Sequence, residues 1–183
     1  MQDLDDIARL IGGQADMMSL LATVARLGLP DAFVGAGFVR DAVWDVLHGR
    51  EPSCSRLRDV DVAYFDAQSW GAERDLTLEG RLHELVPSVA WDVKNQARMS
   101  GRNGDEPYRD CAHAIAQWPE TATAIGARLA HGALELCAPH GVADLLALVV
   151  RPTPRFYAKL PIYRARIHAK RWATRWPKLT FVE

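Results

Sequence analysis

Short apolar strands alternate with amphipathic helices through the first half of this sequence, and no other feature constrains its fold as strongly. Apolar side chains recur at spacings of three and four over residues 3–28, which predicts helix, and Gly12–Gly13 divides that helix in two. Short apolar or alternating runs predict strands over 32–35, 59–65 and 89–93. Helices are predicted over 37–48 and 72–86. Such alternation is typical of an α/β or α+β domain, in which a small mixed β-sheet is flanked by helices.

The second half of the chain has weaker patterns. In order, they predict a helix over 107–118, a hairpin of strands 124–130 and 133–137, an apolar helix over 141–150 and a basic helix over 155–172. Pro152 would stop the apolar helix, and Pro161 would kink or interrupt the basic one, because proline lacks the N–H that a helix needs.

Composition excludes several classes of protein. Of 183 residues, 49% are hydrophobic and 25% are charged, which allows a sizeable core and argues against disorder. No apolar run approaches the ~20 residues that span a bilayer, and Met1–Asp6 lacks the basic start of a secretory signal. Three cysteines without a C-x-x-C pair form no disulfide framework, so a cytoplasmic location is expected.

Charge is distributed unevenly along the chain. Residues 151–183 hold nine lysines and arginines and one acid, Glu183, whereas residues 1–150 hold 13 basic and 22 acidic side chains. We therefore expect a domain over 1–150 and a basic helical extension over 151–183 packed on it. The extension either meets phosphate or an acidic surface, or is a solvated face packed on the acidic domain. Within it, Trp172 and Trp176 either stack on a nucleobase or pack in the core.

The strongest local motif is D-V-D-V at 59–62. Side chains at i and i+2 of a strand share a face, so Asp59 and Asp61 would stand side by side, with Val60 and Val62 turned to the core. Adjacent carboxylates repel, and Mg²⁺ would compensate them because it takes oxygen ligands and leaves positions open for phosphates. The alternative is a surface strand that carries alternating acids.

Two further segments add candidate site residues. The sequence V-G-A-G-F-V-R-D at 34–41 places glycines where a strand ends and a helix begins, which would let backbone N–H groups approach a phosphate. A tight turn that needs small residues is the alternative. Asp92 lies in the apolar run V-A-W-D-V, where a carboxylate is costly to bury unless it is paired or bound to metal. An acid at the end of a strand that is hydrogen-bonded or faces solvent is the alternative there.

The order of these segments resembles that of the DNA polymerase β-type nucleotidyltransferase superfamily. The segments AGFVRDAVWDVLHG and DVDVAYFD are similar to the start of tRNA CCA-adding enzymes and poly(A) polymerases. With WDVKNQARM, WPETATAIGARL and APHGVADLLALVVRP, they resemble a family of small bacterial nucleotidyltransferase-like proteins of unassigned substrate. The similarity spans roughly residues 33–155 and implies a nucleotidyltransferase fold.

The resemblance also implies roles for individual residues. Ala36 and Gly37 match the turn that meets the triphosphate, and Asp59, Asp61 and Asp92 match the catalytic, metal-binding carboxylates. The chain departs from the family pattern in three places: Ala36 replaces the first glycine of the turn, the loop before the paired acids is long, and Ser100 stands where a histidine is expected.

Three other polar residues are candidate nucleotide contacts. Arg40 could face phosphate, with an ion pair to Asp41 or Asp45 as the alternative. Lys94 and Asn95 could contact the nucleotide or the acceptor, with structural hydrogen bonds as the alternative.

The activity that the resemblance implies is transfer of a nucleoside monophosphate from a nucleoside triphosphate (NTP) to an acceptor, by a two-metal mechanism with Mg²⁺ or Mn²⁺. RNA, a protein side chain and a small molecule all stay open as acceptors, as do the preferred nucleotide and the oligomeric state. No membrane partner is expected. The second hypothesis is a non-catalytic module that binds a nucleotide or a partner, since a fold does not fix a function.

A zinc site is a further alternative. Cys111, His113, Cys137 and His140 are residue types that bind zinc. Cys111 and His113 fall in a predicted helix, however, where positions i and i+2 point in different directions.

Overall fold

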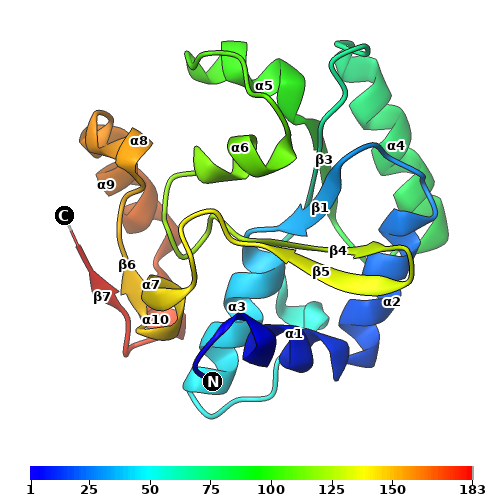
Figure 1. Ribbon diagram of the computed structural model, residues 1–183. Helices are drawn as coiled ribbons and strands as arrows, with labels where there is room; N and C mark the ends of the chain where they lie inside the picture. Colours follow the sequence, from blue (N-terminus) through cyan, green and yellow to red (C-terminus); the bar gives the residue numbers. More distant parts are fainter. Residues whose placement is uncertain (183) are drawn as a thin grey trace.

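A five-stranded mixed sheet forms the centre of the computed structural model, which describes residues 1–182 (Figure 1). Its strands are β1 (Ala32–Gly35), β2 (Val60–Tyr64), β3 (Trp91–Asn95), β4 (Gly126–Ala130) and β5 (Ala133–Cys137). They are arranged in the order β3-β2-β1-β4-β5, with β2 and β3 parallel and every other neighbouring pair antiparallel. The predicted fold class, a small mixed sheet flanked by helices, is therefore confirmed.

The helices cover both faces of this sheet. They are α1 (Leu4–Gly12), α2 (Ala15–Ala25), α3 (Gly37–Leu47), α4 (Ala72–Leu85), α5 (Gln96–Asn103), α6 (Cys111–Ala116), α7 (Ala143–Leu146), α8 (Pro154–Tyr157), α9 (Leu160–Lys170) and α10 (Trp172–Arg175), with a 3₁₀ turn at Cys54–Arg56. Figure 1 shows α6 on one side of β4 and β5, and α1, α2 and α3 on the other.

The alternation of residues in β2 assigns its two faces. Val60, Val62 and Tyr64 are buried in the main hydrophobic core, as the sequence predicted. Ala63 points the other way, into a smaller cluster that α6 covers through Cys111 and other residues. Asp61 shares this second face, because residues two apart in a strand point the same way.

Predicted and observed elements differ most after residue 90. The third strand lies at Trp91–Asn95 rather than 89–93, and the helix α5, which the sequence analysis missed, begins where the Asn95 side chain accepts the backbone N–H of Ala97. The apolar helix predicted over 141–150 is wrong beyond one turn: Leu148 adopts a left-handed conformation (φ +59°), which ends the helix. Residues 149–150 then form a strand.

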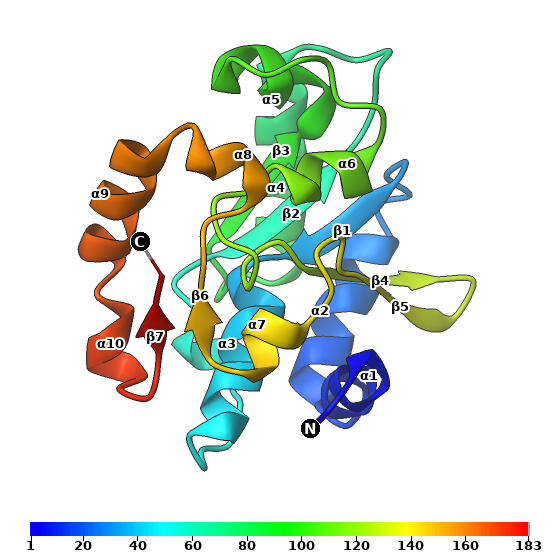
Figure 2. The ribbon, with the colours of Figure 1, turned by 60° about the vertical axis from the view of Figure 1, so that its left-hand side comes forward.

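The C-terminal segment, residues 154–182, folds back onto α3 (Figure 2). Strand β7 (Thr180–Phe181) pairs in parallel with β6 (Val149–Val150), so the predicted boundary at residue 150 falls within this small sheet. Trp44 of α3 makes edge-to-face contacts with Trp172 and Trp176, with ring centroids 5.6 and 5.1 Å apart. All three rings are buried, so the two C-terminal tryptophans are part of the core.

Proline 161 does not kink a longer helix. It lies in the first turn of α9, where its missing N–H is not needed. Among residues 1–182, no helix is long and apolar enough to cross a membrane.

Candidate active site

A cleft of about 170 Å³ lies between the end of β1, the strand β2 and the C-terminal segment. Its sheet-side residues come from the turn and first part of α3 and from the loop that leads into β2: Ala36, Gly37, Arg40, Asp41, Arg56, Leu57, Arg58, Asp59 and Asp61. Its opposite wall comes from α9 and α10: Arg166, Lys170, Arg171, Trp172, Arg175 and Trp176. Residues more than a hundred positions apart thus enclose one space.

Asp59 and Asp61 line the sheet side of this cleft, and Asp92 lies beside Asp61 on the neighbouring strand. Asp61 is the register partner of Asp92 in the parallel strand β3, and Asp59 precedes β2 on the same face. Neighbouring strands lie about 4.8 Å apart. Burial, followed by the charges of Asp59 and Asp92, raises the pKa of Asp61 to about 6. The carboxylates are thus close enough to repel, as the spacing predicted.

The turn between β1 and α3 lies directly beside Asp61. Gly35 is the register partner of Asp61 in the antiparallel strand β1, and Ala36 and Gly37 follow it into the cleft. No side chain caps α3, so its first backbone N–H groups, which have no intrahelical partner, are available to a ligand. A helix N-terminus of this kind attracts anions.

Ala36 adopts a backbone conformation that favours glycine, with φ +51° and ψ −118°. We expect Ala36→Gly to raise the free energy of unfolding by about 1 kcal/mol, because the strain on the Cβ is removed. Urea denaturation of both proteins measures this change.

Gly35→Ala is the matched control for that prediction. A Cβ at Gly35 would lie 2.5 Å from the Trp118 ring, so this variant should lose about 1–3 kcal/mol. Equal or lower stability of Ala36→Gly would show that the turn is not strained.

Arg40 lines the cleft but is not a free cation. Its guanidinium donates to Asp41 Oδ1 at 2.7 and 3.0 Å and to Thr123 Oγ1 at 2.9 Å. It also lies over the rings of Trp44 and Trp172, at 5.0 and 4.5 Å from their centroids. The ion pair with Asp41 is therefore present, and contact with phosphate stays a prediction for this residue.

Lys94 and Asn95 have different surroundings. Lys94 bonds the Asp92 carboxylate and donates to Glu79 Oε1 at 3.0 Å, so it is held beside the acids. Asn95 is the register partner of Tyr64, on the opposite face of the sheet from Asp61. It is 0% exposed, and its amide nitrogen donates to two carbonyl oxygens of the loop that follows β2. The structure does not bring Asn95 to the cleft.

Metal-ligand geometry is incomplete in this arrangement. Within residues 1–182, no group of three or more His, Cys, Asp or Glu side chains is placed to hold a metal ion. Among the three acids, the Asp92 carboxylate forms an ion pair with Lys94. For the predicted zinc ligands, Cys111 donates to the Ala63 carbonyl and His140 Nε2 to the Ala116 carbonyl. The zinc alternative has no support in the described part of the chain.

Most lysines and arginines of residues 151–182 form ion pairs with carboxylates of the rest of the chain. Ion pairs join Arg151 to Asp144, Arg155 and Lys159 to Asp105, Arg166 to Glu120, and Arg175 to Asp41 and Asp45. The side chains of Lys170 and Arg171 make no hydrogen bond or ion pair with residues 1–182, and both residues line the cleft. Burial, followed by the charges of Arg166 and Arg40, lowers the pKa of Lys170, while Asp59 and Asp61 oppose the shift.

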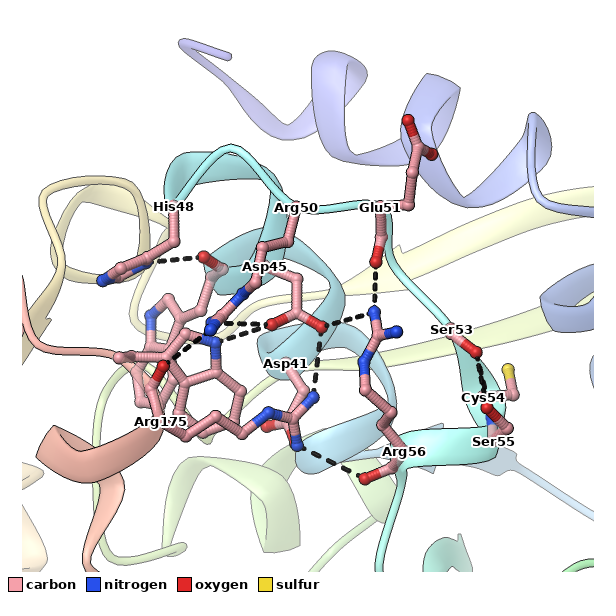
Figure 3. Close-up of polar contacts among 12 residues, drawn as sticks. Asp41, Asp45, His48, Arg50, Glu51, Ser53, Cys54, Ser55, Arg56 and Arg175 are labelled. Atoms are coloured by element: carbon pink, nitrogen blue, oxygen red, sulfur yellow. Dashed lines mark hydrogen bonds and ion pairs between the residues drawn. The ribbon is translucent and has the colours of Figure 1, made fainter.

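Asp45 connects α3 to the loop before Asp59 and to the C-terminal segment (Figure 3). Its buried carboxylate accepts Trp176 Nε1 at 2.8 Å and pairs with Arg50, Arg56 and Arg175 at 3.0, 3.2 and 3.1 Å. Burial opposes ionisation, but the bonds from Trp176, Arg175 and Arg56 together lower the pKa of Asp45. One carboxylate on α3 therefore fixes both the loop before Asp59 and the C-terminal segment.

A mixed sheet with acids beside a helix N-terminus defines a protein of the nucleotidyltransferase fold. A protein whose NMR structure reveals a CCA-adding enzyme head domain superposes with a TM-score of 0.89 and 32% identity, covering 100% of this chain and 97% of that one. The nucleotidyltransferase family model matches residues 22–181. The chain belongs to the nucleotidyltransferase family, as its sequence predicted.

Larger enzymes share the fold at lower identity. A CCA-adding enzyme in complex with CTP superposes with a TM-score of 0.57 and 15% identity, covering 100% of this chain and 44% of that one. A tRNA-processing enzyme in an apo form gives 0.52 and 17%, covering 90% and 45%. The chain thus spans less than half the length of these two enzymes. No curated protein gives a significant match.

Proposed function

We propose that this protein transfers a nucleoside monophosphate from an NTP to an acceptor, in the cleft between β2 and the C-terminal segment. The observation that carries the proposal is the meeting of Asp59 and Asp61 with the uncapped N-terminus of α3 in one cleft. Membership of the nucleotidyltransferase family and the fold shared with CTP- and ATP-bound enzymes support it.

The residues present fit a divalent cation. Carboxylate oxygens are the donors that Mg²⁺ and Mn²⁺ take. Burial, followed by the charges of Asp59 and Asp92, raises the pKa of Asp61, and a bound cation would oppose that shift. Asp59 and Asp61 would hold the ion, which when bound neutralises charge on the reacting phosphate. A second ion would also need Asp92, whose carboxylate is held by Lys94.

The chain's own groups account for the remaining parts of the proposed reaction. The free N–H groups at the start of α3 would donate hydrogen bonds to the triphosphate, and Arg40, held by Asp41, would add positive charge beside it. Asp92, once released from Lys94, is the candidate to take the proton of the attacking hydroxyl.

Loss of both paired acids should remove metal binding. We expect Asp59→Asn combined with Asp61→Asn to abolish Mn²⁺ binding in isothermal titration, because both carboxylates that the proposal assigns to the ion are removed. The folded state should persist, since like charges are removed from a partly buried site. Glu84→Gln, an exposed acid on α4, is the control and should bind as wild type does. Unchanged Mn²⁺ affinity in the double variant would refute the assignment.

The decisive test of the function is turnover. The full chain is incubated with Mg²⁺ and each α-labelled NTP in turn, with RNA, protein and small-molecule acceptors supplied separately. Release of pyrophosphate together with label on one acceptor class would support transfer and would name the acceptor.

The second candidate is a module that binds nucleotide without turnover. It is favoured by the ion pair that engages Asp92 and by the incomplete metal-ligand group among residues 1–182. Nucleotide binding without pyrophosphate release from any acceptor mixture would support this module over the enzyme.

A further inference from the structure

Two kinds of cation face the cleft. Arg40, Arg56, Arg166 and Arg175 all have carboxylate partners. The side chains of Lys170, Arg171 and Arg58 line the same space and make no hydrogen bond or ion pair within residues 1–182. The paired arginines hold the elements around the cleft together. The unpaired side chains leave positive charge available to a ligand in the cleft.

Lys170 is held in place from both sides along the chain. Arg166, one helical turn earlier, donates to Oε1 of the fully buried Glu120 at 2.7 Å. Arg171 then adopts a left-handed conformation (φ +50°), and Trp172 packs against Trp44. The last residue of α9 is thereby fixed at the cleft. A partly buried ammonium without a partner is costly unless an anion joins it.

We infer that Lys170 binds the phosphate tail of the nucleotide, with Arg171 beside it on the C-terminal segment and Arg58 on the loop before β2 completing the anion-binding site. The inference rests on the proposed function, because it assigns the ligand of the same cleft. It concerns a small polyphosphate rather than a nucleic acid strand, since a strand needs cations spaced along a track. Here Arg155, Lys159, Arg166 and Arg175 of the segment are paired with carboxylates, and the unpaired side chains of Lys170, Arg171 and Arg58 line a single cleft.

Titration calorimetry with inorganic triphosphate and with ATP and CTP, each with Mg²⁺, tests the inference. Lys170→Gln should weaken triphosphate and NTP binding by about tenfold or more, because one charge-assisted hydrogen bond is lost. Lys170→Arg should restore most of the affinity. Lys178→Gln removes the same charge from the same segment outside the cleft and should bind within about twofold of wild type. Thermal unfolding of each variant shows that it is folded.

The outcomes separate this inference from the proposed function. Binding by Lys170→Gln as tight as wild type would overturn the inference and leave the function standing. Weakened triphosphate binding without nucleotidyl transfer by wild type would support the inference and count against the enzyme. If wild type binds neither triphosphate nor any NTP, both are wrong. Tight binding of single-stranded RNA that Lys170→Gln weakens, without triphosphate binding, would also overturn the inference.

Discussion

Asp61→Asn should stabilise the metal-free protein by up to about 3 kcal/mol at pH 7 and reduce nucleotidyl transfer about a hundredfold or more. The pKa of Asp61 is about 6 in the folded protein and 3.8 as the unperturbed value, chiefly because burial disfavours the charge. Folding therefore has to overcome the cost of an ionised Asp61 at neutral pH. Asparagine removes that cost together with the charge that would hold a metal ion.

The sign of the pH dependence follows from the direction of the shift. A carboxyl with a raised pKa favours the folded state most below its unfolded pKa, and that stabilisation is lost as the pH rises through the folded value. The advantage of Asp61→Asn should thus be small at pH 4, grow between pH 4 and 6, and be constant above. Urea denaturation across this range, together with transfer assays at pH 7, measures both effects.

Asp66→Asn provides the contrast. The backbone N–H of Gln68 and the ion pair with Arg74 lower the pKa of Asp66, so this variant should lose stability at neutral pH. If Asp61→Asn is destabilised at pH 7, or keeps its full advantage at pH 4, burial of its charge is not the cause of the shift.

Asp45→Ala should lower the free energy of unfolding by about 3 kcal/mol and the melting temperature by roughly 10 °C. The variant leaves the Trp176 N–H without its acceptor and Arg50, Arg56 and Arg175 without a shared carboxylate. Differential scanning calorimetry measures the change. Because the loop before Asp59 and the C-terminal segment both depend on this carboxylate, nucleotide affinity should fall as well.

Glu135→Ala is the control for Asp45→Ala. Glu135 pairs with Arg128 on the hairpin at 2.8 Å, but 43% of its side chain is exposed, so its loss should cost less than about 1 kcal/mol. A comparable loss in the two variants would show that Asp45 acts as an ordinary surface charge.

The sequence predicted the sheet side of the site well, because that side depends on local patterns. Val60, Val62 and Tyr64 alternate with Asp61 and Ala63, so a period of two assigned both faces of β2. The helix between β2 and β3 made parallel neighbours of these strands, which is why Asp61 and Asp92 lie in register. The glycines at 34–41 predicted the turn before α3, and the resemblance to nucleotidyltransferases assigned Ala36 and Gly37 to it as the residues that meet a triphosphate.

The other wall of the cleft could not be predicted in the same way. Its position depends on Trp176 and Arg175 reaching Asp45, at separations of 131 and 130 residues, and no local period encodes such contacts. The signal for Asp45 that the sequence offered was its position between the apolar residues Trp44 and Val46 in a predicted helix. Arg58 was missed as well, although a basic residue directly before the paired acids is visible in the sequence. Asn95 was misplaced because β3 ends at residue 95 and not at 93 as predicted. Asn95 is therefore part of the strand, on the face opposite Asp61, where it bonds the loop after β2.

The route of the chain has a consequence for biosynthesis. All five strands of the central sheet are present once the ribosome has added Cys137, so the sheet can pair while the remainder is still being translated. The cleft gains its second wall only after Trp176 has emerged and reached Asp45. A chain in which Trp176 has not yet emerged can therefore carry the acids on a paired sheet and yet lack the enclosure around them, so competence to retain a ligand is acquired only after the C-terminal segment has been made.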